Sequence, residues 1–321
     1  LDVVIDNDPN AFILLRVNVG KYYNTGDYPS SEIVKYATKR ADHLNMVSIS
    51  SKRWLSEAKK MLEDLVKYIR SHPVYSKHVF GYHIECGEWF QYMFRENGLD
   101  ISESNSSRFR EWLRNKYKTD AALQSAWSDK SVTLANAKVP TDLPGNISFK
   151  PEEYTLMLKS SDRKYIDYLD YIGSLVSDII AELSTTVKNA SNRENIVIAF
   201  YGYLFELADP QSGHFGLDKL LAHKDIDGFA SPECYLDRNV NELFPNQPAG
   251  STGAYMSAVD SIQRAGKMWF VESDQRTFIN RANASTEHDS YLVPAKSVWE
   301  VQELAKRDVG WNMLRGSAIW F

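Results

Sequence analysis

The sequence predicts a β-strand at Ala11-Phe12-Ile13-Leu14-Leu15-Arg16-Val17-Asn18-Val19, a stretch that is apolar throughout apart from Arg16 and Asn18. A strand that is apolar on both faces is typical of a parallel sheet covered by helices on both sides. Further apolar runs follow at 78–85, 196–203, 226–231, 267–272 and 317–321, and amphipathic helical patterns lie at 55–69, 165–183, 217–221, 256–264 and 297–314. The order strand, helix, strand predicts an α/β protein with right-handed crossovers.

A (β/α)8 barrel of the TIM type fits this pattern better than an open sheet. No glycine-rich phosphate turn follows any predicted strand, and acidic, aromatic or polar residues repeatedly stand where strands end. Only six strands are found, so the barrel is predicted to be incomplete. We interpret 1–321 as a single barrel domain, with a long helical excursion at about 89–160 on the face where loops shape a cleft.

Composition excludes several classes of protein. The net charge of −5, from 37 basic and 42 acidic residues, argues against a nucleic-acid or anionic-membrane surface. No apolar run approaches the ~20 residues of a membrane-spanning helix. Two cysteines cannot build a disulfide framework, no Cys/His cluster has zinc spacing, and we expect no cofactor. The aromatic content, with 8 Trp, 18 Tyr and 14 Phe, suits stacking on sugar rings as well as core packing.

The beginning of the chain gives no targeting information. It opens with Leu1 and Asp2, and no basic segment leads into an apolar one. We therefore expect a trimmed or processed chain, or an incomplete reading frame. A soluble protein of a bacterial cytoplasm, or a secreted one, is consistent with this pattern.

Acidic residues at strand ends carry the sharpest chemical signal. Glu88 stands in Gly87-Glu88-Trp89, just past the second predicted strand, and Glu272 ends the fifth. Burying a carboxylate at the end of an apolar strand costs free energy, so such a residue is expected to have a paired charge or a role in binding or catalysis. Two such groups, flanked by aromatic residues, are what glycoside hydrolysis needs: one protonates the leaving oxygen, and the other attacks or activates water.

Several stretches, in order along nearly the whole chain, resemble one family. They are 12–17, 81–84, 87–90, 231–232 and 271–277, the helix pair 109–117 with Leu123 and Trp127, and the closing run 297–321. Together they resemble the β-galactosidase-like glycoside hydrolases of clan A, close to family 42. The resemblance implies a (β/α)8 barrel that retains anomeric configuration, with Glu88 as acid/base at the end of barrel strand four and Glu272 as nucleophile at the end of strand seven.

The same resemblance points to two departures. Counting backwards makes the Ala11 run barrel strand three, so strands one and two are not found in this chain. Either the barrel is open on one side, or another chain or segment closes it, and a homo-oligomer that covers the open edge is one expectation. Many clan members also place Asn before the acid/base, whereas Gly87 precedes Glu88 here, which leaves Glu85 as the alternative acid.

Further residues are candidates for contact with the substrate. Glu272 must be ionised, and Arg16 or Arg276 could keep it so, whereas Glu88 must carry a proton, which Trp89 and Phe90 favour. The substrate-binding candidates are Arg16, His83, Glu85, Tyr201, Tyr203, Tyr235, Arg276 and Trp320.

Most of these residues also have a structural alternative. Arg16 could instead form a buried ion pair, and His83 could be a hydrogen-bonded interior histidine. Tyr201 and Tyr203 are expected on one face, in the site or in the core. Trp320 is favoured as a sugar platform, whereas Trp269 has the opposite strand parity to Glu272 and is expected to pack against helices. His214 and Glu206 are possible rim contacts.

These observations favour a retaining, exo-acting β-glycosidase, with β-galactosidase as the first hypothesis and an oligosaccharide or glycoside as substrate. The alternative is a catalytically impaired barrel that binds carbohydrate. Turnover of nitrophenyl glycosides, lost in Glu272→Ala, distinguishes the two.

Overall fold

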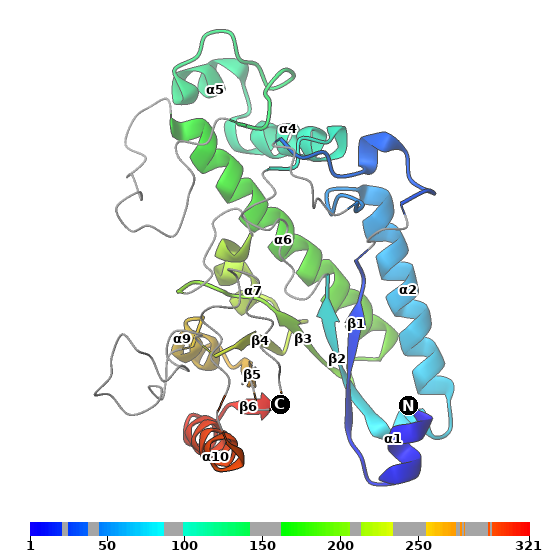
Figure 1. The fold of residues 1–321 in the computed structure, drawn as a ribbon. Coiled ribbons are helices and arrows are strands. Elements are labelled where there is room, and N and C mark those ends of the chain that lie inside the picture. The colour runs from blue at the N-terminus through cyan, green and yellow to red at the C-terminus, as the bar shows by residue number, and fades with distance from the viewer. Residues whose placement is uncertain are drawn as a thin grey trace, which may run out of the picture.

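The fold is built on one curled parallel sheet (Figure 1). The computed structural model describes residues 1–20, 25–37, 45–86, 99–141, 162–205, 213–233, 255–273, 277, 279, 295 and 297–321. The strands are β1 (Ile13–Asn18), β2 (Val79–Glu85), β3 (Ile196–Phe200), β4 (Gly228–Pro232), β5 (Met268–Glu272) and β6 (Ala318–Trp320). They pair in chain order, each parallel to the next, which confirms the predicted strands to within a few residues.

The curl of the sheet is seen in contacts between strands that are not neighbours. The ring of Trp320 in β6 lies 5.7 Å from His83 in β2 and 5.6 Å from Phe200 in β3. In a flat sheet, β2 and β6 would be roughly 19 Å apart, at ~4.8 Å per strand spacing. The six strands therefore wrap into part of a barrel. Among the described residues, β1 and β6 each pair with a single strand, so the partial barrel has two free edges.

Helices lie on the outer face of the sheet and beyond its ends. They are α1 (Asp2–Asn7), η1 (Ser30–Glu32), α2 (Lys52–Ser71), α3 (Tyr75–His78), α4 (Glu103–Tyr117), α5 (Asp120–Trp127), α6 (Arg163–Ala190), η6 (His214–Gly216), α7 (Leu217–Ala222), α9 (Val259–Arg264) and α10 (Val298–Leu314). Figure 1 shows the long α6 beside α2, outside β1 to β3. In the described part of the chain, no helix has both the length and the apolar character that a membrane crossing requires.

Helix boundaries follow local chemistry. The hydroxyl of Ser51 accepts a hydrogen bond from the Trp54 amide at 3.0 Å and caps the start of α2. The helix ends at Ser71, two residues before Pro73, as its sequence predicts. Gly266 and Gly316, at φ +74° and +65°, follow α9 and α10 in the left-handed conformation typical of a helix C-terminus.

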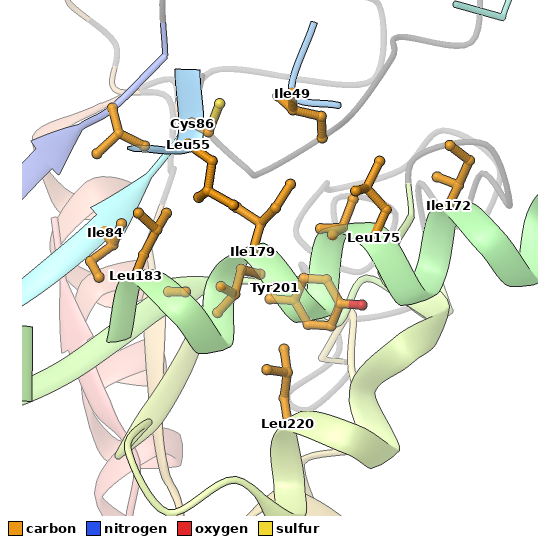
Figure 2. Packing of buried hydrophobic residues seen from close by; sticks show 14 of the residues in the cluster. Ile49, Leu55, Ile84, Cys86, Ile172, Leu175, Ile179, Leu183, Tyr201 and Leu220 are labelled. Carbon is orange, nitrogen blue, oxygen red and sulfur yellow. The ribbon is translucent and has the colours of Figure 1, made fainter. Parts of the chain in front are cut away.

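The main core lies between the sheet and these outer helices (Figure 2). Ile84 of β2, Leu55 of α2 and Leu183 of α6 are buried members of this core, and Ile84 lies beside Leu183. Trp269 of β5 is buried in the same layer, 6.1 Å from the ring of Tyr255. The predicted outward orientation of Trp269 is therefore confirmed.

The predicted helical excursion is described over 99–141 and contains α4 and α5. The carboxylate of Asp167 in α6, fully buried, anchors both helices. It accepts hydrogen bonds from Lys116 at 2.9 Å, Tyr117 at 2.6 Å and Trp127 at 2.7 Å, and from Arg163 at 3.1 Å. One buried carboxylate thus joins α4 and α5 to the barrel helix α6. Residues 142–161 lie outside the described residues.

Candidate active site

The candidate site lies on the inner face of the curled sheet, toward the carboxyl ends of its strands. Side chains alternate along each strand, so Arg16, His83 and Glu85 share this face with Glu272 and Trp320. Arg16 pairs in register with His83, and Glu272 with Trp320. Catalytic residues of (β/α)8 enzymes occupy this end of the barrel.

Arg16 and Glu85 form an ion pair on this inner face. The Arg16 Nη2 and Nε atoms donate to Glu85 Oε2 at 2.7 and 3.1 Å. The side chains are 42% and 13% exposed, so both are accessible to solvent. The Arg16 guanidinium also lies 5.2 Å from the centre of the Phe200 ring. The structure therefore shows an ion pair of Arg16, as the alternative in the sequence analysis expected, but Arg16 is partly exposed rather than buried.

His83 is an interior residue held between aromatic rings. Its ring lies 4.6 Å from Phe200 and 5.7 Å from Trp320, and the residue is 1% exposed. Burial, and secondarily the positive charge of Arg16, lowers the pKa of His83 to about 3, so the imidazole is neutral. Its Nε2 is buried with no hydrogen-bond partner among the described residues. The structure thus places His83 in the wall beneath the site, sealed from solvent.

The two candidate tyrosines after β3 lie on different faces, so the prediction of a common face is wrong. Tyr201 is fully buried in the outer core, where its hydroxyl donates to the Gly213 carbonyl at 2.8 Å. Tyr203 packs instead in the inner cluster with Phe200. Gly202 between them has φ +96°, a left-handed conformation that interrupts strand alternation. Tyr201 therefore lies in the core, the packing alternative for that residue.

His214 holds the turn after β3 in place. Its Nδ1 accepts hydrogen bonds from the backbone amides of Gly202 and Tyr203, both at 3.2 Å. Its ring also stacks on Tyr201, with ring centres 4.7 Å apart, and the residue is fully buried. These contacts give His214 a structural place rather than the rim position considered from the sequence.

Glu272 and Trp320 form the other wall of the site. Trp320 packs with the inner cluster of Phe200, Tyr203, Ala230 and Met256 and remains partly exposed. Glu272 is also partly exposed and ends β5 on the same face. The amide of the next residue, Ser273, donates to the Trp320 carbonyl at 2.8 Å, which ties the end of β5 to β6.

Sequence reasoning missed a polar layer behind Glu272. Ser273 Oγ donates to Asp308 Oδ2 at 3.1 Å, and Asn312 Nδ2 donates to Glu233 Oε1 at 3.0 Å. Asp308 and Asn312 come from the buried face of α10. The two residues are four positions apart in a predicted helix, on the face that is normally apolar. This polar pair was the feature of the sequence from which the layer could have been predicted.

Other candidates lie outside the described residues. They are Glu88, Tyr235, Arg276 and Glu206. Their positions, and the separation of Glu88 from Glu272, therefore stay predictions.

A hollow of about 560 Å³ lies among the outer helices. Trp112 of α4, Asp170 and Ser174 of α6, Phe215 of η6 and Lys219 of α7 contribute to its walls. None of the predicted site residues lines it, so it is separate from the candidate site.

Comparison with known proteins finds similarity to solved structures. No family model matches the chain, and no curated protein matches it. Among solved structures, it is similar to a β-galactosidase of the psychrophilic Marinomonas ef1, with TM-score 0.61 and 16% identity over 86% of this chain and 40% of that one. The catalytic domain of a Paenibacillus polymyxa β-amylase has TM-score 0.63 and 11% identity over 99% and 78%. A family 42 β-galactosidase of G. stearothermophilus, in catalytic-mutant form, has TM-score 0.57 and 14% identity over 98% and 49%.

These similarities establish the fold and leave the substrate open. The chain spans less than half of the length of the two β-galactosidases, 40% and 49%. The region that matches is part of a longer protein in each case. The chain therefore has a partial α/β barrel fold, similar to the fold of these glycoside hydrolases.

Proposed function

We propose that this protein is a retaining, exo-acting β-glycosidase, with β-galactosides as the first substrates to test. The observation that carries the proposal is the position of Glu272. Its carboxylate ends a barrel strand on the inner face, partly exposed and beside the aromatic Trp320, in a fold shared with glycoside hydrolases. A carboxylate beside an aromatic platform suits attack on a bound sugar.

The proposed reaction has two steps. In the first, a carboxylate oxygen of Glu272 forms a bond to the anomeric carbon as the bond to the leaving oxygen breaks, and Glu88 gives its proton to that oxygen. In the second, water attacks the anomeric carbon, Glu88 takes a proton from the water, and the bond to Glu272 breaks. Both carboxyl groups then return to their starting state. This double displacement requires the two carboxyl groups to lie ~5–5.5 Å apart.

The Arg16 ion pair favours Glu88 over Glu85 as the acid. Glu85 accepts two N–H hydrogen bonds from the Arg16 guanidinium, both on Oε2, so this carboxyl group is already engaged in holding Arg16. The pair is better suited to bind sugar hydroxyls, since Arg16 is 42% exposed and lies on the inner face of the sheet. We propose Trp320 as the platform under the sugar ring, and Tyr235 and Arg276 as further contacts.

The alternative is a barrel that binds carbohydrate without turnover. The free edges of β1 and β6 favour it, because a catalytic pair needs support from its surroundings to hold its geometry. In that case Trp320 and the Arg16–Glu85 pair would bind sugar, and Glu272 would not react.

The test is hydrolysis of a panel of nitrophenyl β-glycosides by the wild-type chain and by Glu272→Gln. We expect wild-type turnover, its near-complete loss in the variant, and recovery in Glu272→Ala when azide replaces the missing nucleophile. Glu63→Gln, an exposed substitution on α2, is the control and should keep wild-type activity. Sugar affinity without turnover, unchanged by Glu272→Gln, would establish the binding alternative.

We also propose that a second copy of the chain covers the open side of the barrel. Met268 and Ala318 face inward by alternation with Phe270 and Trp320, yet both are exposed, Met268 by 38%. Free strand edges and exposed apolar side chains are features that proteins usually cover.

A further inference from the structure

We infer that Asp308 of α10 is a positioning residue for Glu272, acting through Ser273. The inference rests on the proposed role of Glu272 as nucleophile. It concerns how the carboxylate is held, and not which atoms it attacks.

The first observation is the character of the buried face of α10. Its buried residues are Leu304, Asp308 and Asn312, each four positions from the next and hence on one face of the helix. A helix that packs against a sheet normally presents an apolar stripe. Here two of the three buried side chains are polar. Burying such groups is costly unless they are hydrogen-bonded, so their partners indicate their role.

The partner of Asp308 is the residue that follows the proposed nucleophile. Ser273 Oγ donates to Asp308 Oδ2 at 3.1 Å, and Arg307 donates to the other carboxylate oxygen at 2.7 Å. Asp308 is only 2% exposed, so water competes little for these bonds. The Ser273 amide donates to the Trp320 carbonyl at 2.8 Å. Ser273 is thus fixed by its backbone to β6 and by its side chain to α10.

The second polar residue of the stripe fixes the strand on the other side of Glu272. Asn312 donates to Glu233 Oε1 at 3.0 Å, and its own oxygen accepts from the Tyr255 hydroxyl at 3.0 Å. Glu233 directly follows β4, and its amide lies 3.4 Å from the Glu272 carbonyl oxygen, to which it donates. The helix therefore fastens the ends of both β4 and β5.

These contacts should matter most for the rate of the reaction, because the nucleophile must be held in the geometry in which it attacks. A misplacement of about 1 Å can cost ~10²-fold in rate even when the altered residue is remote. The loss of the Asp308–Ser273 bond should therefore lower kcat and leave sugar binding, which depends on other walls of the site, largely intact.

The experiment compares Asp308→Ala, Asp308→Asn and Ser273→Ala on a nitrophenyl glycoside that the wild type hydrolyses. We expect Asp308→Ala and Ser273→Ala to lower kcat ~10-fold or more, with KM changed by about twofold or less. Asp308→Asn should recover most of the rate, because its amide oxygen can still accept from Ser273. The rate of labelling by a 2-deoxy-2-fluoro glycoside, which reports attack by the nucleophile, should follow kcat.

Asp225→Ala is the matched control. Asp225 is buried to a similar degree and has the same kinds of partner, an arginine, Arg193, and a hydroxyl, that of Thr185, but it precedes β4 at the opposite end of the strand. The substitution Asp225→Ala should lower the melting temperature of the protein and leave kcat at the wild-type value. An unchanged kcat in Asp308→Ala, or an equal loss of kcat in Asp225→Ala, would overturn the inference.

Hydrogen–deuterium exchange separates this inference from the proposed function. Amides of 268–273 should exchange faster in Asp308→Ala than in Asp225→Ala, whether or not the protein is an enzyme. If the wild type shows no turnover, the proposed function fails, and the exchange result alone decides: faster exchange in this segment supports the positioning role, and equal exchange overturns it.

Discussion

Acid is expected to destabilise this fold through His83, the neutral histidine inside the barrel. Burial, with the charge of Arg16, lowers its pKa to about 3 in the folded chain. In an unfolded chain the pKa of histidine is ~6.5. Between these values the unfolded state binds a proton that the folded state excludes. The free energy of unfolding should therefore be fully retained above pH ~6.5 and fall as the pH drops toward 3.

The size of this effect follows from the difference between the two pKa values. At about 1.36 kcal/mol per pKa unit, the whole loss down to pH 3 is roughly 5 kcal/mol. At pH 5 the part already lost is about 2 kcal/mol. For a chain of 321 residues this corresponds to a melting temperature lower by about 3 °C.

The assay is thermal unfolding of the wild type and of His83→Gln, followed by circular dichroism at pH 8 and pH 5. Glutamine cannot take up a proton, so the variant should lose about 3 °C less than the wild type between these two conditions. At pH 8 the histidine is neutral in both the folded and the unfolded state. The difference in melting temperature between the two proteins at that pH therefore measures the change in packing and serves as the internal control. An equal loss in both proteins would refute the role given to His83.

Three further changes have defined expected results. Asp167→Ala should lower the free energy of unfolding by about 3–5 kcal/mol in urea denaturation, because it removes the buried acceptor of four hydrogen bonds that join α4, α5 and α6; a loss below ~1 kcal/mol would contradict this. Gly202→Ala should destabilise more than Gly266→Ala, since both have positive φ but only at Gly202 would the new Cβ meet another atom, Ser257 Oγ at 2.7 Å; equal unfolding midpoints would oppose it. Light scattering after gel filtration should give a dimer mass for the wild type and a lower mass for Met268→Lys, and a wild-type monomer would exclude the proposed second copy.

Local sequence determined the elements of this fold. The alternation of apolar runs and amphipathic helices predicted all six strands in their parallel order, as well as the outward side of Trp269. These features could be predicted because the burial of a strand or helix imposes its own period on the residues within it. Parity within a strand also put His83 and Glu85 on one face, whereas the pairing register of the strands, which the sequence does not give, brought Arg16, Glu85 and Glu272 to the same side of the sheet.

Only the tertiary structure decided which side chains meet. Arg16 pairs with Glu85, 69 positions away, and Ser273 bonds to Asp308, 35 positions away. No local period encodes such contacts, because they depend on how the sheet curls and where a helix docks on it. Tyr201 and Tyr203 lie on different faces because Gly202 between them has a positive φ, and the hydrogen bonds from the Gly202 and Tyr203 amides to His214 hold this turn. Sequence patterns thus specify the faces of each element, whereas pairings between distant elements arise from their packing in three dimensions.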